Sequence, residues 1–236
     1  MFRFTQSLLA DFTDLVFPNL CLGCNRLLRA NEPLLCATCR VNLPETQQHL
    51  AQTSNESLPR FAGKVPVEFA LSYLYFSKGG TVQQLIHHIK YKGRKEAAKT
   101  TGMWYGQQLK EESNVPQKID LLLGVPLHKS RLQQRGYNQA DWIAEGIAES
   151  LDVPVRTDVL SRVRFDSSQT RRSRMERWQN VETVFAVTNP EVIKNKRVAL
   201  VDDVLTTGAT LEACAIELLR AGCQSVGIIT LAVTKS

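Results

Sequence analysis

The sequence predicts an α/β protein with a mostly parallel sheet flanked by helices, preceded by a small module built around cysteines. Three observations predict it: apolar segments alternate with amphipathic ones from residue 67 onward, one apolar segment ends in two adjacent aspartates, and four cysteines near the beginning form two CxxC pairs. Alternating strands and helices favour parallel strands covered on both faces. With 236 residues, 43% of them hydrophobic, the chain can build one such domain and one small module.

The first 18 residues, MFRFTQSLLADFTDLVFP, are predicted to form an amphipathic helix because apolar side chains recur at helical spacing. Asp11 and Asp14 lie inside the apolar stretch and no small-residue cleavage site follows, so the segment does not resemble a signal peptide. The helix would pack on the protein itself. A membrane-surface anchor is the alternative, disfavoured because Arg3 is the only basic residue there. No apolar run approaches the roughly 20 residues that span a bilayer, and we expect a cytoplasmic protein.

Cys21, Cys24, Cys36 and Cys39 are predicted to bind a structural zinc ion in a ribbon covering residues 19–42. Two residues within each pair and eleven between the pairs let four thiolates form the tetrahedral shell that Zn²⁺ accepts. Disulfide bonds are disfavoured because nothing marks the chain for export, and a redox CxxC would need one pair only. Four protein thiolates leave no open position, so the metal would hold the ribbon together rather than do chemistry.

The rest of the chain divides into a polar connection and a larger domain. Residues 43–64, punctuated by prolines and Gly63, are predicted to be a linker or long connection, and residues 65–236 are predicted to form the α/β domain. Asn138 would cap one of its helices, with Asp141 in a variant of the capping box. We expect strands at 67–76, 119–126, 198–203 and 225–233, and helices at 81–91, 138–151 and 209–222.

The stretch VALVDDVLTTGAT, residues 198–210, places polar residues where an apolar strand is predicted to end. Ligands of parallel sheets bind at this carboxyl edge. A helix N-terminus with Gly208 and threonine hydroxyls suits a phosphate, and Asp202 and Asp203 would accept hydrogen bonds from two vicinal hydroxyls of a sugar. The alternative, that the acids cap a helix and the threonines fill a turn, explains one acid but not both, because successive strand residues face opposite sides.

VALVDDVLTTGAT resembles the signature with which type I phosphoribosyltransferases bind phosphoribosyl diphosphate (PRPP). Together with the cysteine-rich start, three further segments resemble the ComF family of competence-associated proteins, so that the similarity covers nearly the whole chain. The resemblance implies a type I phosphoribosyltransferase-like parallel sheet, a PRPP site and a task in DNA uptake. The three segments are IHHIKYKGRKEAA (86–98), VPLHKSRLQQRGYNQADWIA (125–144) and QTRRSRMERWQNVETVF (169–185).

The resemblance also implies roles for individual residues. Asp202 and Asp203 match the acids that hold the ribose hydroxyls, and Lys129 and Arg131 would add charges to the diphosphate loop. Mg²⁺ normally accompanies the diphosphate. Purine-salvage members carry an acid at the position of Thr206, which cannot act as a general base at neutral pH, so the site is closer to orotate or regulatory types. The 5′-phosphate would lie on the turn formed by Thr206, Thr207, Gly208, Ala209 and Thr210.

Basic residues gather in two further stretches of a chain whose net charge is +6. Lys90, Lys92 and Arg94 flank Tyr91, and six arginines lie between residues 162 and 177. Both stretches suit an anionic partner, either a diphosphate or a nucleic-acid backbone, and the alternative is a solvated charged surface. The six arginines are Arg162, Arg164, Arg171, Arg172, Arg174 and Arg177. The hallmark RGYNQA, residues 135–140, has no role that the sequence defines.

Two functions remain open at this point. In the first, the protein binds PRPP and takes part, with the proteins of DNA uptake, in handling imported single-stranded DNA. In the second, it is a Mg²⁺-dependent phosphoribosyltransferase of nucleotide salvage or biosynthesis with an unidentified acceptor. The signature fits both, because phosphoribosyltransferase folds include members that bind PRPP without transferring it.

Overall fold

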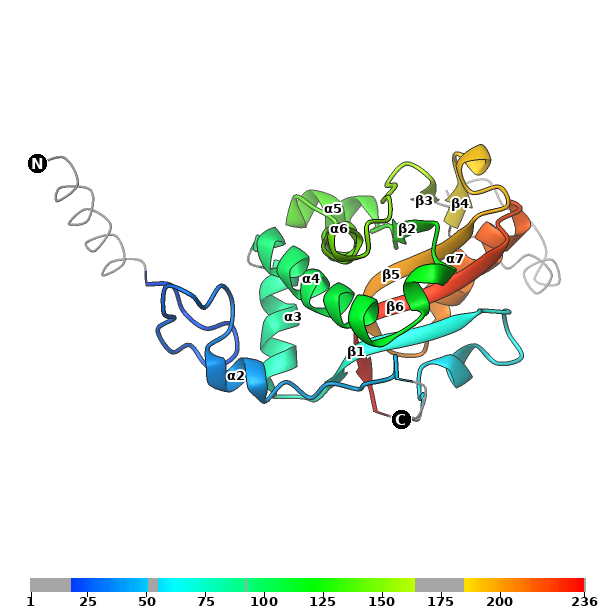
Figure 1. Cartoon of the computed structure of the whole chain (residues 1–236). Helices are drawn as coiled ribbons and strands as arrows, with labels where there is room; N and C mark the ends of the chain where they lie inside the picture. The colour runs from blue at the N-terminus through cyan, green and yellow to red at the C-terminus, as the bar shows by residue number, and fades with distance from the viewer. Residues whose placement is uncertain (1–17, 51–54, 92, 164–184, 236) are drawn as a thin grey trace, which may run out of the picture.

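Four parallel strands form the centre of the structure, a computed structural model that describes residues 18–50, 55–91, 93–163 and 185–235 (Figure 1). The strands stand in the order β1-β6-β5-β2, with bounds Phe69–Phe76 for β1, Leu121–Gly124 for β2, Arg197–Leu205 for β5 and Ser225–Thr234 for β6. A separate antiparallel pair is made by β3, Leu160–Arg162, and β4, Phe185–Val187. The predicted parallel sheet is therefore confirmed.

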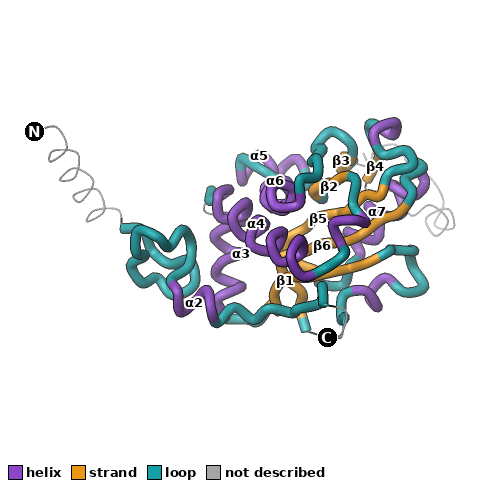
Figure 2. Tube along the Cα trace, viewed as in Figure 1, coloured by secondary structure: helices purple, strands orange, loops and turns teal. Residues whose placement is uncertain are grey.

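Helices cover both faces of this sheet (Figure 2). One face carries α3 (Thr81–Tyr91), α4 (Lys95–Glu112) and α6 (Gln139–Leu151), and the other carries α7 (Ala209–Arg220). Shorter helices are α2 (Ala37–Val41) and α5 (Lys129–Arg135), and single 3₁₀ turns span Leu58–Phe61, Val115–Lys118 and Pro190–Val192.

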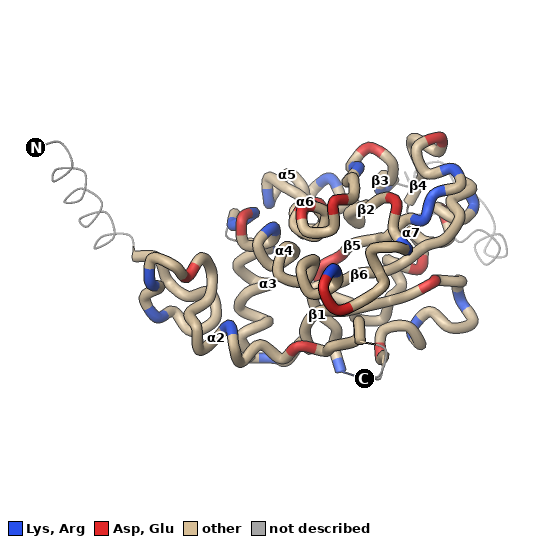
Figure 3. Tube along the Cα trace, viewed as in Figure 1, with Lys and Arg blue, Asp and Glu red and all other residues tan. Residues whose placement is uncertain are grey.

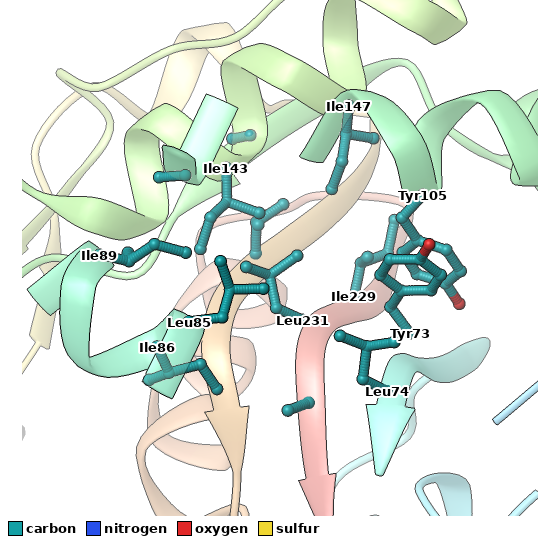
Figure 4. Close-up of a cluster of buried hydrophobic side chains, with 14 of the residues drawn as sticks. Tyr73, Leu74, Leu85, Ile86, Ile89, Tyr105, Ile143, Ile147, Ile229 and Leu231 are labelled. Atoms are coloured by element: carbon teal, nitrogen blue, oxygen red, sulfur yellow. The ribbon is translucent and has the colours of Figure 1, made fainter. Parts of the chain in front are cut away.

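The run Val198–Val201 of β5 is continuously apolar because both of its faces are buried. Ala199 and Val201 pack in the cluster beneath α3, α4 and α6, whereas Val198 and Leu200 pack in the cluster beneath α7. Figure 4 shows the first cluster, in which side chains of α3 and α6 meet those of β6. Two buried cores of this kind hold the sheet rigid, so its carboxyl edge is a stable platform for a site.

Helix α4 has no counterpart among the predicted elements. Its buried face consists mainly of small residues, among them Ala98, Gly102 and Gly106, with Tyr105 and Leu109 as its large members, so its apolar pattern is too weak to mark an amphipathic helix. The small residues let α4 approach α6 closely: a Cβ added at Gly146 of α6 would lie 2.0 Å from the carbonyl oxygen of Lys99. The two backbones are in direct contact along this line.

Residues 43–50 pack along the outer edge of β1. The amide of Thr46 donates to the carbonyl of Tyr73 over 2.9 Å, and the amide of Tyr75 donates to the carbonyl of Pro44 over 2.8 Å. Buried polar side chains continue the attachment, since the Ser57 hydroxyl bonds to Gln48 at 2.7 Å. The predicted linker is thus a packed connection that covers the free edge of β1.

Three predicted features fall outside the described residues: the helix at 1–18, apart from its last residue, Lys92 of the basic stretch around Tyr91, and the arginines from Arg164 to Arg177. In the part of the chain that is described, no helix has the length and apolar character needed to cross a membrane.

Candidate functional site at the carboxyl edge of the sheet

The strand that carries the two aspartates is longer than predicted. We expected the strand to deliver the acids to its end, but β5 continues to Leu205, because β6 offers partners beyond the acids: Asp202 pairs with Thr230 and Val204 with Ala232. On the other side, β2 stops at Gly124, opposite Val201. At the two acids β5 therefore pairs with β6 on one side, while its other side is no longer paired with β2.

Because the strand continues through them, Asp202 and Asp203 face opposite sides of the sheet. Asp203 is buried toward α3 and α6, where both of its carboxylate oxygens have partners. Lys90 Nζ lies 2.9 Å from Oδ1, and Gln139 Nε2 donates to Oδ2 over 2.7 Å. Gln139 in turn accepts from Arg135 Nη1 over 2.7 Å. A chain of polar contacts thus joins the ends of α3, α5 and α6 to one aspartate.

Asp202 lies on the side of α7 and lines the small pocket at the end of β5, together with every residue from Val204 to Leu211. One of its oxygens accepts the amide of Asp203 over 2.8 Å. Burial is the main cause that raises the pKa of the Asp202 carboxyl, and the negative charge of Asp203 raises it further. The positive charges of Lys90 and Arg135 oppose that rise. An additional cation near this carboxyl would favour its charged form.

The turn between β5 and α7 has the form that binds an anion. Gly208, the residue before α7, has a left-handed backbone with φ of +85°, a conformation that glycine adopts without strain. Thr206, Thr207, Ala209 and Thr210 are exposed around it. The first turn of α7 leaves backbone amides without intrahelical partners and carries the positive end of the helix dipole, so an anion in this pocket would meet several donors.

Two further residues, Arg60 and Phe61, contact this turn. Neither was predicted from the sequence. The Arg60 guanidinium donates to the carbonyl of Thr206 and to that of Thr234, at the ends of β5 and β6. The Phe61 ring lies against Gly208, where an added Cβ would be 3.1 Å from Phe61 Cε1. No sequence signal reveals the contact, because Arg60 and Thr206 are 146 positions apart.

Lys129 and Arg131 are both exposed on α5. The chain becomes helical at Lys129, with His128 as the N-cap that accepts the amide of Ser130, so the predicted diphosphate loop is short and the two cations belong to a helix. Their assignment to a diphosphate stays a prediction.

The RGYNQA hallmark gains structural roles. Asn138 caps α6, as predicted, by accepting the amide of Ala140 over 3.3 Å, and its side-chain nitrogen donates to the carbonyl of Val125 over 3.1 Å. The guanidinium of Arg135 lies 5.1 Å from the ring centre of Tyr91, a distance at which a cation attracts an aromatic face. The motif thus ties the start of α6 to the end of β2 and, through Gln139, to Asp203.

The four cysteines of the two CxxC pairs come together. The sulfur atoms of Cys21, Cys24, Cys36 and Cys39 all lie within 4.8 Å of one another, and Cys24 Sγ is 3.7 Å from Cys36 Sγ. The amides of Gly23 and Cys36 point at Cys21 Sγ, at 3.4 and 3.2 Å. Amide donors of this kind stabilise a thiolate, and the spacing suits a metal of the size of zinc at the centre of the cluster.

Of the six arginines between 162 and 177, Arg162 is described. It ends β3, and its guanidinium lies 5.3 Å from the ring centre of Phe185 on β4. Figure 3 shows that Lys and Arg are scattered among Asp and Glu over the described chain and do not collect in one stripe.

Residues 140–236, from the start of α6 to the end of the chain, match the family model of the phosphoribosyl transferase domain. The fold is of the phosphoribosyltransferase type, as the resemblance implied. Among solved structures, an allosteric regulatory enzyme of purine biosynthesis is similar with a TM-score of 0.43 and 23% identity, over 61% of this chain and 29% of that chain.

Two curated relatives match nearly the full length. Competence protein F of Haemophilus influenzae is 28% identical over 224 residues, which are 90% of this chain and 90% of that protein. DNA utilization protein YhgH of Escherichia coli O157:H7 is 26% identical over 217 residues, covering 89% of this chain and 88% of the relative. The chain is a homologue of these proteins, and the predicted relationship to the ComF family is confirmed.

Proposed function

We propose that this protein binds PRPP, or a closely related phosphorylated ribose, at the carboxyl edge of its sheet, and that its task is the handling of imported single-stranded DNA. The observation that carries the first part is the pocket in which Asp202 and the amide-lined turn before α7 face the same space. The second part is supported by the relatives, which are named for competence and for DNA utilization. Proteins of the DNA-uptake machinery are the expected partners.

In this proposal the turn from Thr206 to Thr210 binds the 5′-phosphate, and Asp202 and Asp203 accept the ribose hydroxyls. Oxygen ligands are what Mg²⁺ prefers, and Asp202 has a carboxylate whose charged form a cation would stabilise. A bound Mg²⁺ would neutralise diphosphate charge. The residues of the chain do the rest: they fix the phosphate and orient the sugar.

Turnover is the second candidate function. A phosphoribosyltransferase passes through a ribose cation as diphosphate leaves, so that positioning and charge stabilisation supply most of the catalysis. The paired acids favour this candidate, whereas Thr206 offers no general base. Release of diphosphate from PRPP, measured with a panel of bases and with single-stranded DNA, separates transfer from binding alone.

PRPP with Mg²⁺ is expected to raise the melting temperature of the wild-type protein. A ligand at about 100 times its Kd stabilises by about 2.7 kcal/mol, which corresponds to roughly 5–10 °C for a chain of this length. Asp202→Asn and Gly208→Ala should lose most of this shift. The first removes a charge that meets the sugar, and the second forces a methyl group into a left-handed turn against Phe61.

Gly79→Ala is the matched control for Gly208→Ala. Gly79 also has a positive φ, +79°, but a Cβ there meets nothing within 4 Å, so this variant pays the backbone cost without touching the pocket. It should keep the full ligand-induced shift. Equal shifts in the wild type, Asp202→Asn and Gly208→Ala would refute the assignment of the site.

Single-stranded DNA is expected to bind with an affinity that falls steeply with salt, because a chain of net charge +6 would bind chiefly through phosphate contacts. The logarithm of the affinity falls with a slope of about −0.7 for each contacted phosphate. Fluorescence anisotropy between about 50 and 200 mM salt measures this slope. Absence of binding at the lowest salt would contradict the DNA part of the proposal.

We further propose that the metal of the cysteine cluster is zinc and that its role is structural. Four thiolates require a reducing compartment to stay unpaired with one another, which supports a cytoplasmic location.

A further inference from the structure

The contacts of Asp203 raise a question about how a sugar reaches it. Lys90 is bound to one oxygen and Gln139 to the other, and the aspartate side chain is 7% exposed. A ribose hydroxyl that approaches Asp203 must therefore take the place of one of these partners. Gln139 is buried, with 3% of its surface exposed, and is fixed by Arg135. Lys90 is the partner that can leave.

Lys90 has the exposure and the flexible side chain that this displacement requires. Its side chain is 24% exposed, more than three times the figure for Asp203, and it reaches Asp203 from the last turn of α3. A lysine carries a compact charge on a flexible stem with three rotatable donors. The ammonium therefore stays in reach of solvent, so that it can leave Asp203 without first being moved out of a closed core.

Displacing Lys90 from Asp203 costs free energy, which the ligand has to offset. Separating the pair leaves an ammonium beside the site without its counter-ion, and removal of one partner of a buried ion pair is costly. A neutral sugar hydroxyl does not compensate that loss. A ligand that carries a second anionic group close to the hydroxyls compensates the loss, because the released ammonium can pair with that group. In the proposed function the 5′-phosphate binds at the turn before α7, and α7 and Lys90 lie on opposite faces of β5, so the compensating group must be on another carbon of the sugar.

We propose that Lys90 is a specificity residue. In the free protein it occupies the carboxylate of Asp203, and it is displaced by a phosphorylated ribose that also carries a diphosphate on its first carbon. The inference rests on the proposed function, since it concerns the same site. Lys90 thereby discriminates PRPP from ribose 5-phosphate, which has the same sugar and the same 5′-phosphate but offers the ammonium no anion.

Calorimetric titration of the full-length protein with PRPP and with ribose 5-phosphate, both with Mg²⁺, tests this. The wild type should bind PRPP more tightly. Lys90→Gln, which keeps an N–H donor for Asp203 but no charge, should weaken PRPP binding by about tenfold, the effect expected for one charge-assisted contact, and leave ribose 5-phosphate unchanged or tighter. Lys90→Arg, which retains the charge, should restore most of the preference.

Lys99→Met is the matched control. Lys99 also pairs with a carboxylate, at 2.7 Å from Glu149, but both side chains are exposed and neither contacts Asp203 in the described structure, so its loss should leave the ratio of the two affinities unchanged. Equal weakening of both ligands by Lys90→Gln, or no change in either, would overturn the inference while leaving the proposed function intact. Failure of the wild type to bind either ligand would instead contradict the proposed function and the inference with it.

Discussion

Replacement of Gly146 by alanine is expected to destabilise the protein by about 3 kcal/mol, because the helix pair α4 and α6 cannot admit a side chain there. The new Cβ would lie 2.0 Å from the carbonyl oxygen of Lys99 and 2.8 Å from the amide of Met103. Both are backbone atoms, so no rotamer change relieves the contact and one helix must shift. Urea unfolding followed by tryptophan fluorescence, to which Trp104 of α4 and Trp142 of α6 contribute, measures the loss.

The expected loss of stability is opposite in sign to the effect that alanine has in a helix without tight contacts. Alanine in a helix is intrinsically about 1 kcal/mol better than glycine, so a helix without the tight contact would gain stability. Gly106→Ala is the graded control: its Cβ would meet the Cβ of Ser150 at 2.8 Å and the Cα of Ile147 at 3.0 Å, a milder overlap that should cost less. A Gly146→Ala protein as stable as the wild type would refute the close packing of the two helices.

The sequence is sufficient to predict the parts of the fold that are marked by large apolar side chains. Helix α3 and strand β1 stand within two residues of their predicted positions, because each carries a clear periodic or continuous apolar pattern. Helix α4 escaped prediction for the opposite reason: its close contacts with α6 are made at glycines, and close approach of two backbones leaves only a weak apolar period in the sequence. The order of the strands likewise depends on tertiary packing.

The candidate site divides in the same way. Asp202 and the turn before α7 are neighbours in the chain, and the sequence predicts that they meet. Lys90, Gln139 and Arg60 reach the site from distant segments, so their roles depend on how helices are placed against β5. The sequence shows Lys90 as one of several cations near Tyr91, and only its 2.9 Å contact with Asp203 distinguishes it from its neighbours.

The cysteine cluster connects to the main core more closely than a separate ribbon would. Leu22, Leu34 and Leu35 are buried in the same cluster as Leu85 and Ile89 of α3, and Figure 1 shows this segment beside α3. Gly23 adds a tight contact, since a Cβ there would lie 2.6 Å from Cγ2 of Thr81, the first residue of α3. Any metal at the cysteines therefore supports one side of the α/β domain.

Removal of the metal is accordingly expected to lower the stability of the whole protein. The purified protein should contain one zinc per chain, and Cys24→Ala/Cys39→Ala, which deletes one ligand from each pair, should lose it. If the segment then detaches, each of its buried leucines forfeits about 1.5–3 kcal/mol, so the melting temperature of the α/β domain should fall by roughly 10 °C or more. Metal analysis and circular dichroism at rising temperature measure the two effects together.

Cys223→Ala provides the comparison for this variant. Cys223 is buried beneath α7, in the other hydrophobic cluster, so its replacement removes a sulfur atom without touching the four clustered thiols and should leave the zinc content at one per chain. Because a structural zinc site contributes its binding free energy to folding, the loss of metal and the loss of stability should occur in the same variant. Zinc-free wild-type protein, or a double variant that melts with the wild type, would contradict a structural metal at these cysteines.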